Sequence, residues 1–282
     1  MSSSLKYFSL NNNTQIPSIG FGTWLIENGD SAVKNISDAL KCGYRHIDTA
    51  AAYGNEESVG RAIRESGIDR SEIFVTSKVW NTERGYDKAL AAFDKTMEKL
   101  GLDYLDLYLV HWPCNVGSRE EWSKVNSETW RALEKLYKDK RVRAIGVSNF
   151  KVHHLEELLK SCSVVPMVNQ IEFHPGFMQK EILDCCQRNN ILVEAWSPLG
   201  RGRMAASELL QELSGKYGKS IAQICIRWCL QNGVLPLPKT VTQSRMVENA
   251  DVFDFEISVE DMNRINSMEQ FGWSGHDPDT FE

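Results

Sequence analysis

Short apolar segments alternate with segments of helical periodicity along almost the whole chain. Eight apolar segments of strand length lie at 18–22, 44–47, 73–77, 104–110, 142–147, 164–169, 191–196 and 233–237. Helical periodicity fits the segments between and after them, at 30–42, 55–66, 86–100, 126–139, 151–160, 179–189, 219–231 and 242–250. Repeated strand–helix alternation predicts parallel strands joined by crossover helices, because a tight turn cannot join parallel neighbours.

Two architectures satisfy this alternation: an open, doubly wound sheet and a closed (β/α)8 barrel. The 282-residue length is close to the roughly 250 residues typical of the barrel, and no change in composition divides the chain. We therefore predict one α/β domain over residues 1–282, a TIM barrel. Two additions are expected, a β-hairpin from 7–10 and 15–19 that closes one end and an extra C-terminal helix over 258–269.

Composition argues against several classes of partner. The formal net charge is −6 without a basic block, so there is no electrostatic case for binding nucleic acid or an anionic membrane. No apolar run approaches the roughly 20 residues of a membrane span, and the N-terminus lacks the apolar core of a signal peptide. The seven cysteines contain no C-x-x-C pattern, which suits a reducing compartment. We expect a monomeric, cytoplasmic protein.

The fingerprint of a Rossmann dinucleotide site is not convincingly present. Gly20-Phe21-Gly22 is followed by Leu25 where the third small residue belongs. Gly200-Arg201-Gly202 with Ala205 does fit G-x-G-x-x-A, but it falls in the seventh unit and no acidic residue lies near residue 220. We interpret this match as chance, so a nucleotide would have to be held in another way.

Polar or ionisable residues follow nearly every apolar segment. In chain order they are Asp48, Lys78, His111, Ser148, Asn149, Gln170, Trp196, Ser197, Lys239 and Thr240. For each residue alone, a structural role (a helix cap, a turn, a solvated rim or a hydrogen bond to neighbouring backbone) is about as well supported as a functional one. Together they favour a functional site, because a barrel brings the carboxyl ends of all its strands to one rim.

Three of these side chains, Asp48, Lys78 and His111, form a plausible acid–base set with a nearby tyrosine. Tyr53, five residues after Asp48, offers a phenol whose ordinary pKa of about 10 makes it a weak acid. A neighbouring ammonium, Lys78, would lower that pKa, and a carboxylate would hold the ammonium in place. His111 could orient a carbonyl oxygen. This set has no nucleophile and needs no metal, and it fits carbonyl reduction by a hydride from a cofactor.

Other clusters of chemically active residues are interpreted as structural. Adjacent histidines do not share a helix face, so His153 and His154 with Glu156 and Glu157 are not expected to bind metal. Glu172 and His174 are expected to form part of the rim structure. A pair of glycosidase carboxylates is a further alternative, but the visible neighbours of Asp48 are a lysine and a tyrosine.

A series of motifs follows the strand ends in order: GYRHIDTAAAYGNEESVGRAI, TSKVWNTERGYD, LDLYLVHWP, VRAIGVSNF, VVPMVNQIEFHP, ILVEAWSPLG and LPLPKTVTQSRMVENADVFDFEIS. From about residue 8 to 282 the chain resembles the aldo-keto reductase superfamily. It is most similar to short microbial members related to diketogluconate reductases and to the prostaglandin F synthase-like branch.

This resemblance implies a role for each matching position. Tyr53 would be the general acid, tuned by Lys78 and Asp48, and His111 would orient the substrate carbonyl. Lys239 and Arg245 would neutralise a 2′-phosphate, which favours NADPH over NADH. The positions implied to bind the cofactor are Gly22, Thr23, Trp24, Asp48, Ser148, Asn149, Gln170, Trp196, Ser197, Leu199, Gly200, Lys239, Thr240, Val241, Thr242, Arg245, Glu248 and Asn249.

The resemblance also implies a substrate pocket with aromatic walls. Trp24, Trp80 and Trp112, together with His111, match its lining, and a loop over 113–125 and a tail over 270–282 are expected to complete it. Both segments are short, which predicts an open and permissive pocket.

The expected activity is NADPH-dependent reduction of aldehydes and ketones to alcohols. Methylglyoxal, aromatic aldehydes and diketo sugar acids are the expected small-molecule substrates. Two alternatives remain open: reduction of a prostaglandin endoperoxide, and a non-catalytic regulatory subunit that only binds NADPH.

Overall fold

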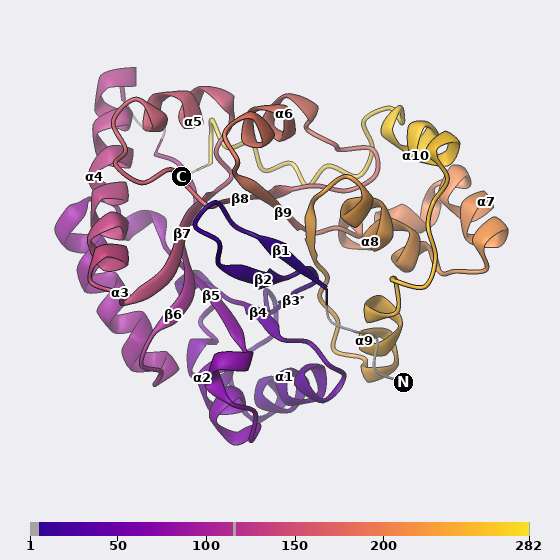
Figure 1. The fold of residues 1–282 in the computed structure, drawn as a ribbon, viewed down its shortest axis with the longest axis horizontal. Coiled ribbons are helices and arrows are strands. Elements are labelled where there is room, and N and C mark those ends of the chain that lie inside the picture. The colour runs from indigo at the N-terminus through magenta and orange to yellow at the C-terminus, as the bar shows by residue number, and fades with distance from the viewer. Residues whose placement is uncertain (1–5, 115–116, 282) are drawn as a thin grey trace.

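A computed structural model describes residues 6–114 and 117–281, and in it eight parallel strands form a barrel surrounded by helices (Figure 1). Each strand pairs with its neighbours in chain order. Backbone N–H groups of Gly20 and Gly22 donate to the carbonyl oxygens of Pro236 and Pro238, 3.0 Å each, and join the first strand to the last. The predicted (β/α)8 architecture is therefore confirmed. The strands are β3 (Phe21–Gly22), β4 (His46–Asp48), β5 (Phe74–Val79), β6 (Leu105–Val110), β7 (Val142–Ser148), β8 (Val168–Glu172), β9 (Leu192–Trp196) and β10 (Leu235–Leu237).

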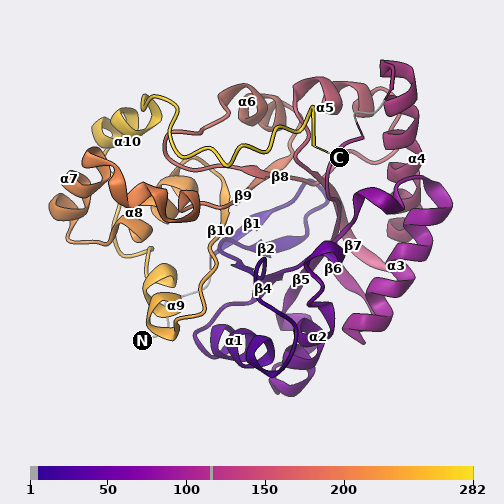
Figure 2. The same cartoon turned by 180° about the vertical axis from the view of Figure 1, so that it is seen from behind.

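Amphipathic helices cover the outside of the barrel and are seen from both sides in Figures 1 and 2. In α3, for example, Phe93, Met97 and Leu100 are buried at the spacing of one helix face. No helix in the described residues is both long and apolar enough to cross a membrane. The helices that follow the strands are α1 (Asp30–Lys41), α2 (Glu56–Glu65), α3 (Tyr86–Leu100), α4 (Arg119–Lys138), α5 (Val152–Leu159), α6 (Lys180–Arg188), α8 (Ile221–Gln231) and α9 (Gln243–Ala250).

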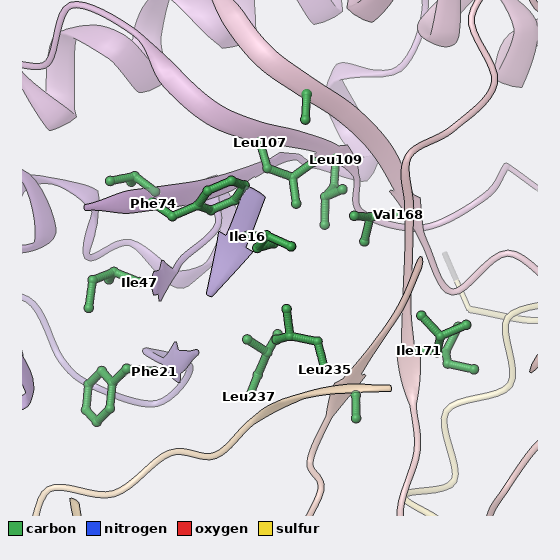
Figure 3. Close-up of a cluster of buried hydrophobic side chains, with 14 of the residues drawn as sticks. Ile16, Phe21, Ile47, Phe74, Leu107, Leu109, Val168, Ile171, Leu235 and Leu237 are labelled. Carbon is green, nitrogen blue, oxygen red and sulfur yellow. The ribbon is translucent and has the colours of Figure 1, made fainter. Parts of the chain in front are cut away.

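The N-terminal hairpin closes one end of the barrel, as the sequence predicted. Strands β1 (Tyr7–Ser9) and β2 (Gln15–Pro17) pair antiparallel. Ile16 of β2 is fully buried and lies among apolar side chains of the barrel strands, including Leu107 and Leu235 (Figure 3). The hairpin therefore closes this end of the barrel with apolar side chains. The carboxyl ends of the strands, where the polar residues were predicted, lie at the opposite end.

The sixth strand of the barrel begins later than the sequence predicted. The apolar segment 164–169 suggested a strand, but β8 starts at Val168. The backbone N–H groups of Ser163 and Val164 donate to Glu134 Oε1 of α4, at 2.6 and 2.8 Å. A side chain of the neighbouring helix thus binds the backbone groups that a strand ladder would have used.

Two helical regions also differ from the prediction. Helix α4 begins at Arg119, not at 126, because Ser118 and Glu121 form a capping box. The segment 113–125 is therefore only partly a loop, and its residues 115–116 lie outside the described part of the chain. Helix α7 (Glu208–Tyr217) was not predicted, whereas the extra helix appears as α10 (Val259–Asn266), capped by Ser258.

Candidate active site

An acid–base array lies where β4, β5 and β6 end. Lys78 is fully buried in β5, and its Nζ donates to Asp48 Oδ1 and Oδ2 at 2.7 and 2.8 Å. The same ammonium donates to the carbonyl oxygen of Thr49 at 2.9 Å and lies 3.3 Å from the Tyr53 hydroxyl. The three hydrogens of the ammonium are therefore shared among fixed acceptors, which holds its charge at the phenol.

Local backbone structure places these side chains. Asp48 is the last residue of β4 and pairs in register with Thr76 of β5, so Asp48 and Lys78 emerge on adjacent strands. A 3-10 turn over Ala51–Tyr53 follows, and Gly54 ends it with φ 67°. Because that left-handed conformation favours glycine, Gly54 suits the end of the turn that carries Tyr53.

Electrostatics keep the array in one protonation state at neutral pH. Burial lowers the pKa of Lys78, but Asp48 and Tyr53 raise it by more, so Lys78 stays charged. Burial raises the pKa of the Tyr53 phenol, Lys78 lowers it and Asp48 raises it, and the net shift is upward. The expected lowering of the phenol pKa by the Lys78 ammonium is therefore present, but burial of the phenol outweighs it. A protonated phenol remains available as a donor.

His111 directly follows β6 and lies against the phenol. Its ring centroid is 5.7 Å from that of Tyr53 and 5.0 Å from that of Trp80, both edge-on. Burial, together with the charges of Lys78 and Arg84, holds the pKa of His111 well below its ordinary value. The imidazole is thus neutral and can donate one N–H to an oxygen beside the phenol.

A second group of polar side chains lies at the ends of β7, β8 and β9. Trp196 Nε1 donates to Asn149 Oδ1 at 2.8 Å, and Asn149 Nδ2 donates to the carbonyl oxygen of His111 at 2.9 Å. Ser148 Oγ donates to the backbone oxygen of Gln170 at 2.7 Å. The structure therefore joins these predicted cofactor positions to the acid–base array through hydrogen bonds.

The predicted positions after β10 and on α9 are much more open. Lys239, Val241, Thr242 and Arg245 are exposed, and within the described residues neither Lys239 nor Arg245 forms an ion pair. Thr240 and Glu248 are half-buried and Asn249 is buried, in the same stretch of chain.

The first strand of the barrel packs at Gly22 against the start of the segment 239–249, which is called the open stretch below. A Cβ built there would lie 3.3 Å from the carbonyl oxygen of Leu237 and 3.7 Å from Lys239 Cβ. Thr23 Oγ1 donates to the carbonyl oxygen of Asp48 at 2.9 Å. Gly22, the last residue of β3, thus lies beside Lys239, and the next residue, Thr23, lies beside Asp48 of the acid–base array.

The loop after β9 is strongly curved. Ser197, Gly200, Arg201 and Gly202 all have positive φ, and the chain continues in a 3-10 turn, not in an α-helix. This geometry agrees with the interpretation of the glycine pattern as a chance match, because a Rossmann site needs the N-terminus of an α-helix.

The predicted aromatic wall divides into two parts. Trp80 lies beside His111, and Trp112 stacks on Phe281 of the tail with centroids 4.0 Å apart. Trp24 instead lies under the guanidinium of Arg201, 4.5 Å from its ring centroid. Phe281 was not singled out from the sequence, and only its place in the expected tail pointed to it.

Ion pairs and hydrogen bonds hold the tail over the rim. Lys151 Nζ lies 2.5 Å from Asp277 and 2.6 Å from Asp279. Ser274 donates its backbone N–H and its hydroxyl to Glu172, at 2.9 and 2.7 Å. Glu172 thus has the structural role expected of it. Residue 282, the end of the expected tail, lies outside the described residues.

The two histidines of α5 are adjacent in sequence and do not share a helix face, yet both lie near one carboxylate, that of Asp279. Asp279 Oδ1 lies 3.1 Å from His153 Nε2 and 3.7 Å from His154 Nε2. His154 Nδ1, however, accepts the backbone N–H of Lys151 at 3.2 Å. A neutral His154 therefore carries its proton on Nε2, which suits a contact to Asp279 better than coordination of a metal.

The architecture and the site define an oxidoreductase built on a (β/α)8 barrel. A model of the Aldo/keto reductase family matches residues 18–270. The chain is 51% identical to the glyoxal reductase of Bacillus subtilis, over 99% of both chains. It is 47% identical to the 9,11-endoperoxide prostaglandin H2 reductase of Trypanosoma cruzi, over 97% of this chain and 95% of the relative.

Solved structures agree with the sequence comparison. A crystal structure of a Gox0644 mutant in complex with NADPH superposes with a TM-score of 0.91 at 40% identity, over 99% of this chain and 100% of that chain. The chain belongs to the aldo/keto reductase family.

Proposed function

We propose that the protein reduces aldehydes and ketones to alcohols with NADPH, and that Tyr53 donates the proton. The observation that carries this proposal is the position of Lys78, whose ammonium is fixed by Asp48 and lies 3.3 Å from the Tyr53 hydroxyl. That arrangement stabilises negative charge on the phenol oxygen while the proton leaves. An exposed lysine of the same sequence spacing would not do so.

The residues around the array fit a nicotinamide cofactor. Both N–H groups of Gln170 are used by Asp48 and Glu194, so its amide oxygen is left to accept an N–H of the carboxamide. Ser148 and Asn149 would complete that contact, and the Trp196 indole would stack on the ring. The cofactor supplies the hydride.

The open stretch fits the remainder of NADPH. Lys239 and Arg245 are exposed and unpaired in the described chain, as suits side chains that neutralise a 2′-phosphate. Ser197, Leu199 and Gly200 would line the pyrophosphate path, and Gly22 admits a close approach beside Lys239. This arrangement favours NADPH over NADH.

The protein side chains then perform the proton transfer. The neutral His111 donates an N–H to the carbonyl oxygen and orients it toward Tyr53. NADPH, when bound, would supply hydride to the carbonyl carbon, and the Tyr53 hydroxyl would give its proton to the oxygen on which negative charge then develops. Lys78 stabilises the resulting phenolate, and Asp48 keeps Lys78 charged and in place.

Small carbonyl compounds suit the walls of this pocket. Trp80, Trp112 and Phe281 offer aromatic faces beside His111, which favours aromatic aldehydes and small dicarbonyls. The relative named glyoxal reductase supports glyoxal as a substrate, and a 39% identical relative named methylglyoxal reductase DkgA, from Escherichia coli, supports methylglyoxal. Diketo sugar acids are a further proposed class.

Endoperoxide reduction is a second candidate, favoured by the 47% identity to the trypanosomal prostaglandin H2 reductase. The same hydride and the same proton donor would serve it. The test is NADPH consumption with methylglyoxal, an aromatic aldehyde, a diketo sugar acid and prostaglandin H2. Turnover of the carbonyls supports the proposal, and the ranking identifies the substrate class. Tight binding of NADPH without any turnover would instead indicate a regulatory subunit.

A further inference from the structure

Glu194 is a buried carboxyl group inside the barrel that the proposed mechanism does not use. It lies on β9, is fully buried, and pairs in register with Gln170 of β8 and Leu235 of β10. A carboxyl group in such a place is costly unless it is neutral or paired. Its surroundings therefore decide what it does.

Glu194 is connected to the acid–base array through one amide group. Gln170 Nε2 donates to Glu194 Oε2 at 2.8 Å and to Asp48 Oδ2 at 2.9 Å. Asp48 in turn holds Lys78, which contacts Tyr53. The second carboxyl oxygen, Glu194 Oε1, has no hydrogen-bond partner among the described residues. Glu194 thus ends a buried chain of contacts that leads to the proton donor.

The groups that face Glu194 favour its neutral form. Burial and the charge of Asp48 on β4 raise its pKa, while Gln170 on β8 and Lys78 on β5 lower it, and the result is about 8. From β10 it meets Leu235, which carries no charge. His46, the other titratable side chain of β4, has its pKa lowered to about 3 by burial and by Lys78, so it adds no charge.

We propose that Glu194 is a positioning residue that acts through Gln170 on the Asp48–Lys78 pair, and that its ionisation weakens reduction by Tyr53. This inference rests on the proposed function. While Glu194 is neutral, the one ammonium of the array faces the one carboxylate of Asp48. An ionised Glu194 would add a second negative charge in a buried setting and so oppose phenolate formation in the transition state.

The test is the pH dependence of reduction by Glu194→Gln. This variant keeps an oxygen that accepts the Gln170 N–H but cannot ionise. We expect its kcat/KM to match the wild type near pH 6.5 and to exceed it by about three- to tenfold at pH 9–10, since one pKa unit on the donor corresponds to a factor of about ten. A merely structural role would change both ends of the profile alike.

A second variant at Glu194 and a control at another buried glutamate test whether the change in pH profile comes from ionisation of Glu194. Glu194→Leu also cannot ionise, so the relative gain at alkaline pH should persist even if its plateau falls. Glu56→Gln is the control, because Glu56 is equally buried and also has a pKa raised chiefly by burial, but bonds Ser77 and lies outside the chain of contacts. Its profile should run parallel to that of the wild type.

Thermal unfolding reports the ionisation without catalysis. The pKa of Glu194 is raised in the folded state, so the folded protein favours its protonated form. The contribution of this protonation to the stability of the fold is fully present below the ordinary pKa of 4.5 and is lost as the pH rises through about 8. The difference in Tm, Glu194→Gln minus wild type, should therefore increase between pH 5 and pH 8.5. A constant difference in Tm, or a constant ratio of kcat/KM, would overturn this inference. An inactive wild type would instead overturn the proposed function.

Discussion

The acid–base array and the open stretch that begins at Lys239 lie on the same rim but are built in opposite ways. Lys78 is 0% and Asp48 3% exposed, and the array is held by hydrogen bonds within the barrel. Lys239 and Arg245 are exposed, with no ion pair in the described chain. The first part is organised before any ligand arrives, whereas the second offers charge that a ligand has to engage.

This structural difference predicts that the array determines the rate of the chemical step and that the open stretch determines which cofactor is bound. Fixed, buried charges lower the barrier of the chemical step, because they need no rearrangement when charge develops. Exposed cations contribute to binding only when a phosphate neutralises them. Substitutions in the array should therefore act on kcat, and substitutions in the open stretch should act on the affinity for the cofactor.

Lys78→Met should have the largest effect. In the proposed mechanism this substitution removes the charge that stabilises the phenolate, and it leaves the Asp48 carboxylate buried and unpaired. We expect kcat to fall by about 10²–10⁴-fold and the free energy of unfolding to fall by about 3–5 kcal/mol. Steady-state kinetics and chemical denaturation measure both. Lys34→Met, which breaks an exposed pair with Asp38, is the control and should change neither strongly.

Asp48→Asn should have the next largest effect, since it keeps the shape of the side chain and removes its charge. Without the carboxylate the pKa of Lys78 falls, and its ammonium is held less firmly beside Tyr53. We expect kcat to fall by about 10- to 100-fold. The fall should be smaller at lower pH, where Lys78 is still protonated. A loss that is the same at every pH would indicate a purely structural role for Asp48.

Arg245→Ala tests the open stretch. The Kd for NADPH should rise by about 10- to 100-fold, the amount expected from losing a charge-assisted contact. The Kd for NADH should change by less than about twofold. Fluorescence titration with both cofactors measures the difference. Equal effects on the two would remove the role in binding the 2′-phosphate and with it the contrast between the two regions.

Phe281→Ala should have the smallest effect. The ring stacks on Trp112 with centroids 4.0 Å apart, so it closes one side of the pocket without touching the array. We expect the KM for an aromatic aldehyde to rise by about two- to tenfold, which corresponds to the interaction free energy of one aromatic pair. The kcat should stay nearly constant. Methylglyoxal, which has no ring, should show little change. A large fall in kcat would place Phe281 in the array.

Much of the fold could be predicted because the signals are local. The eight strands follow from apolar segments, and reading the residue at each strand end located Asp48, Lys78 and His111. Other features depend on contacts distant in sequence. The late start of β8 arises from Glu134 of α4, which binds the backbone N–H groups of Ser163 and Val164.

Three parts of the site could not be predicted for similar reasons. A carboxyl group within the apolar segment of β9 gives no sign of facing the barrel interior, so Glu194 was not recognised. The stacking of Phe281 on Trp112 joins the tail to the end of β6, far apart in sequence. The net upward shift of the Tyr53 pKa depends on burial of the phenol, which the order of residues does not reveal.

The central claim is that Tyr53 donates the proton from an array that exists before substrate binds. The most direct measurement compares Tyr53→Phe with the wild type in a single turnover with NADPH and methylglyoxal, with NADPH binding followed in parallel. We predict an unchanged Kd for NADPH within about twofold and a rate of reduction lower by at least about 10²-fold. A rate near that of the wild type, with NADPH bound equally well, would contradict the claim.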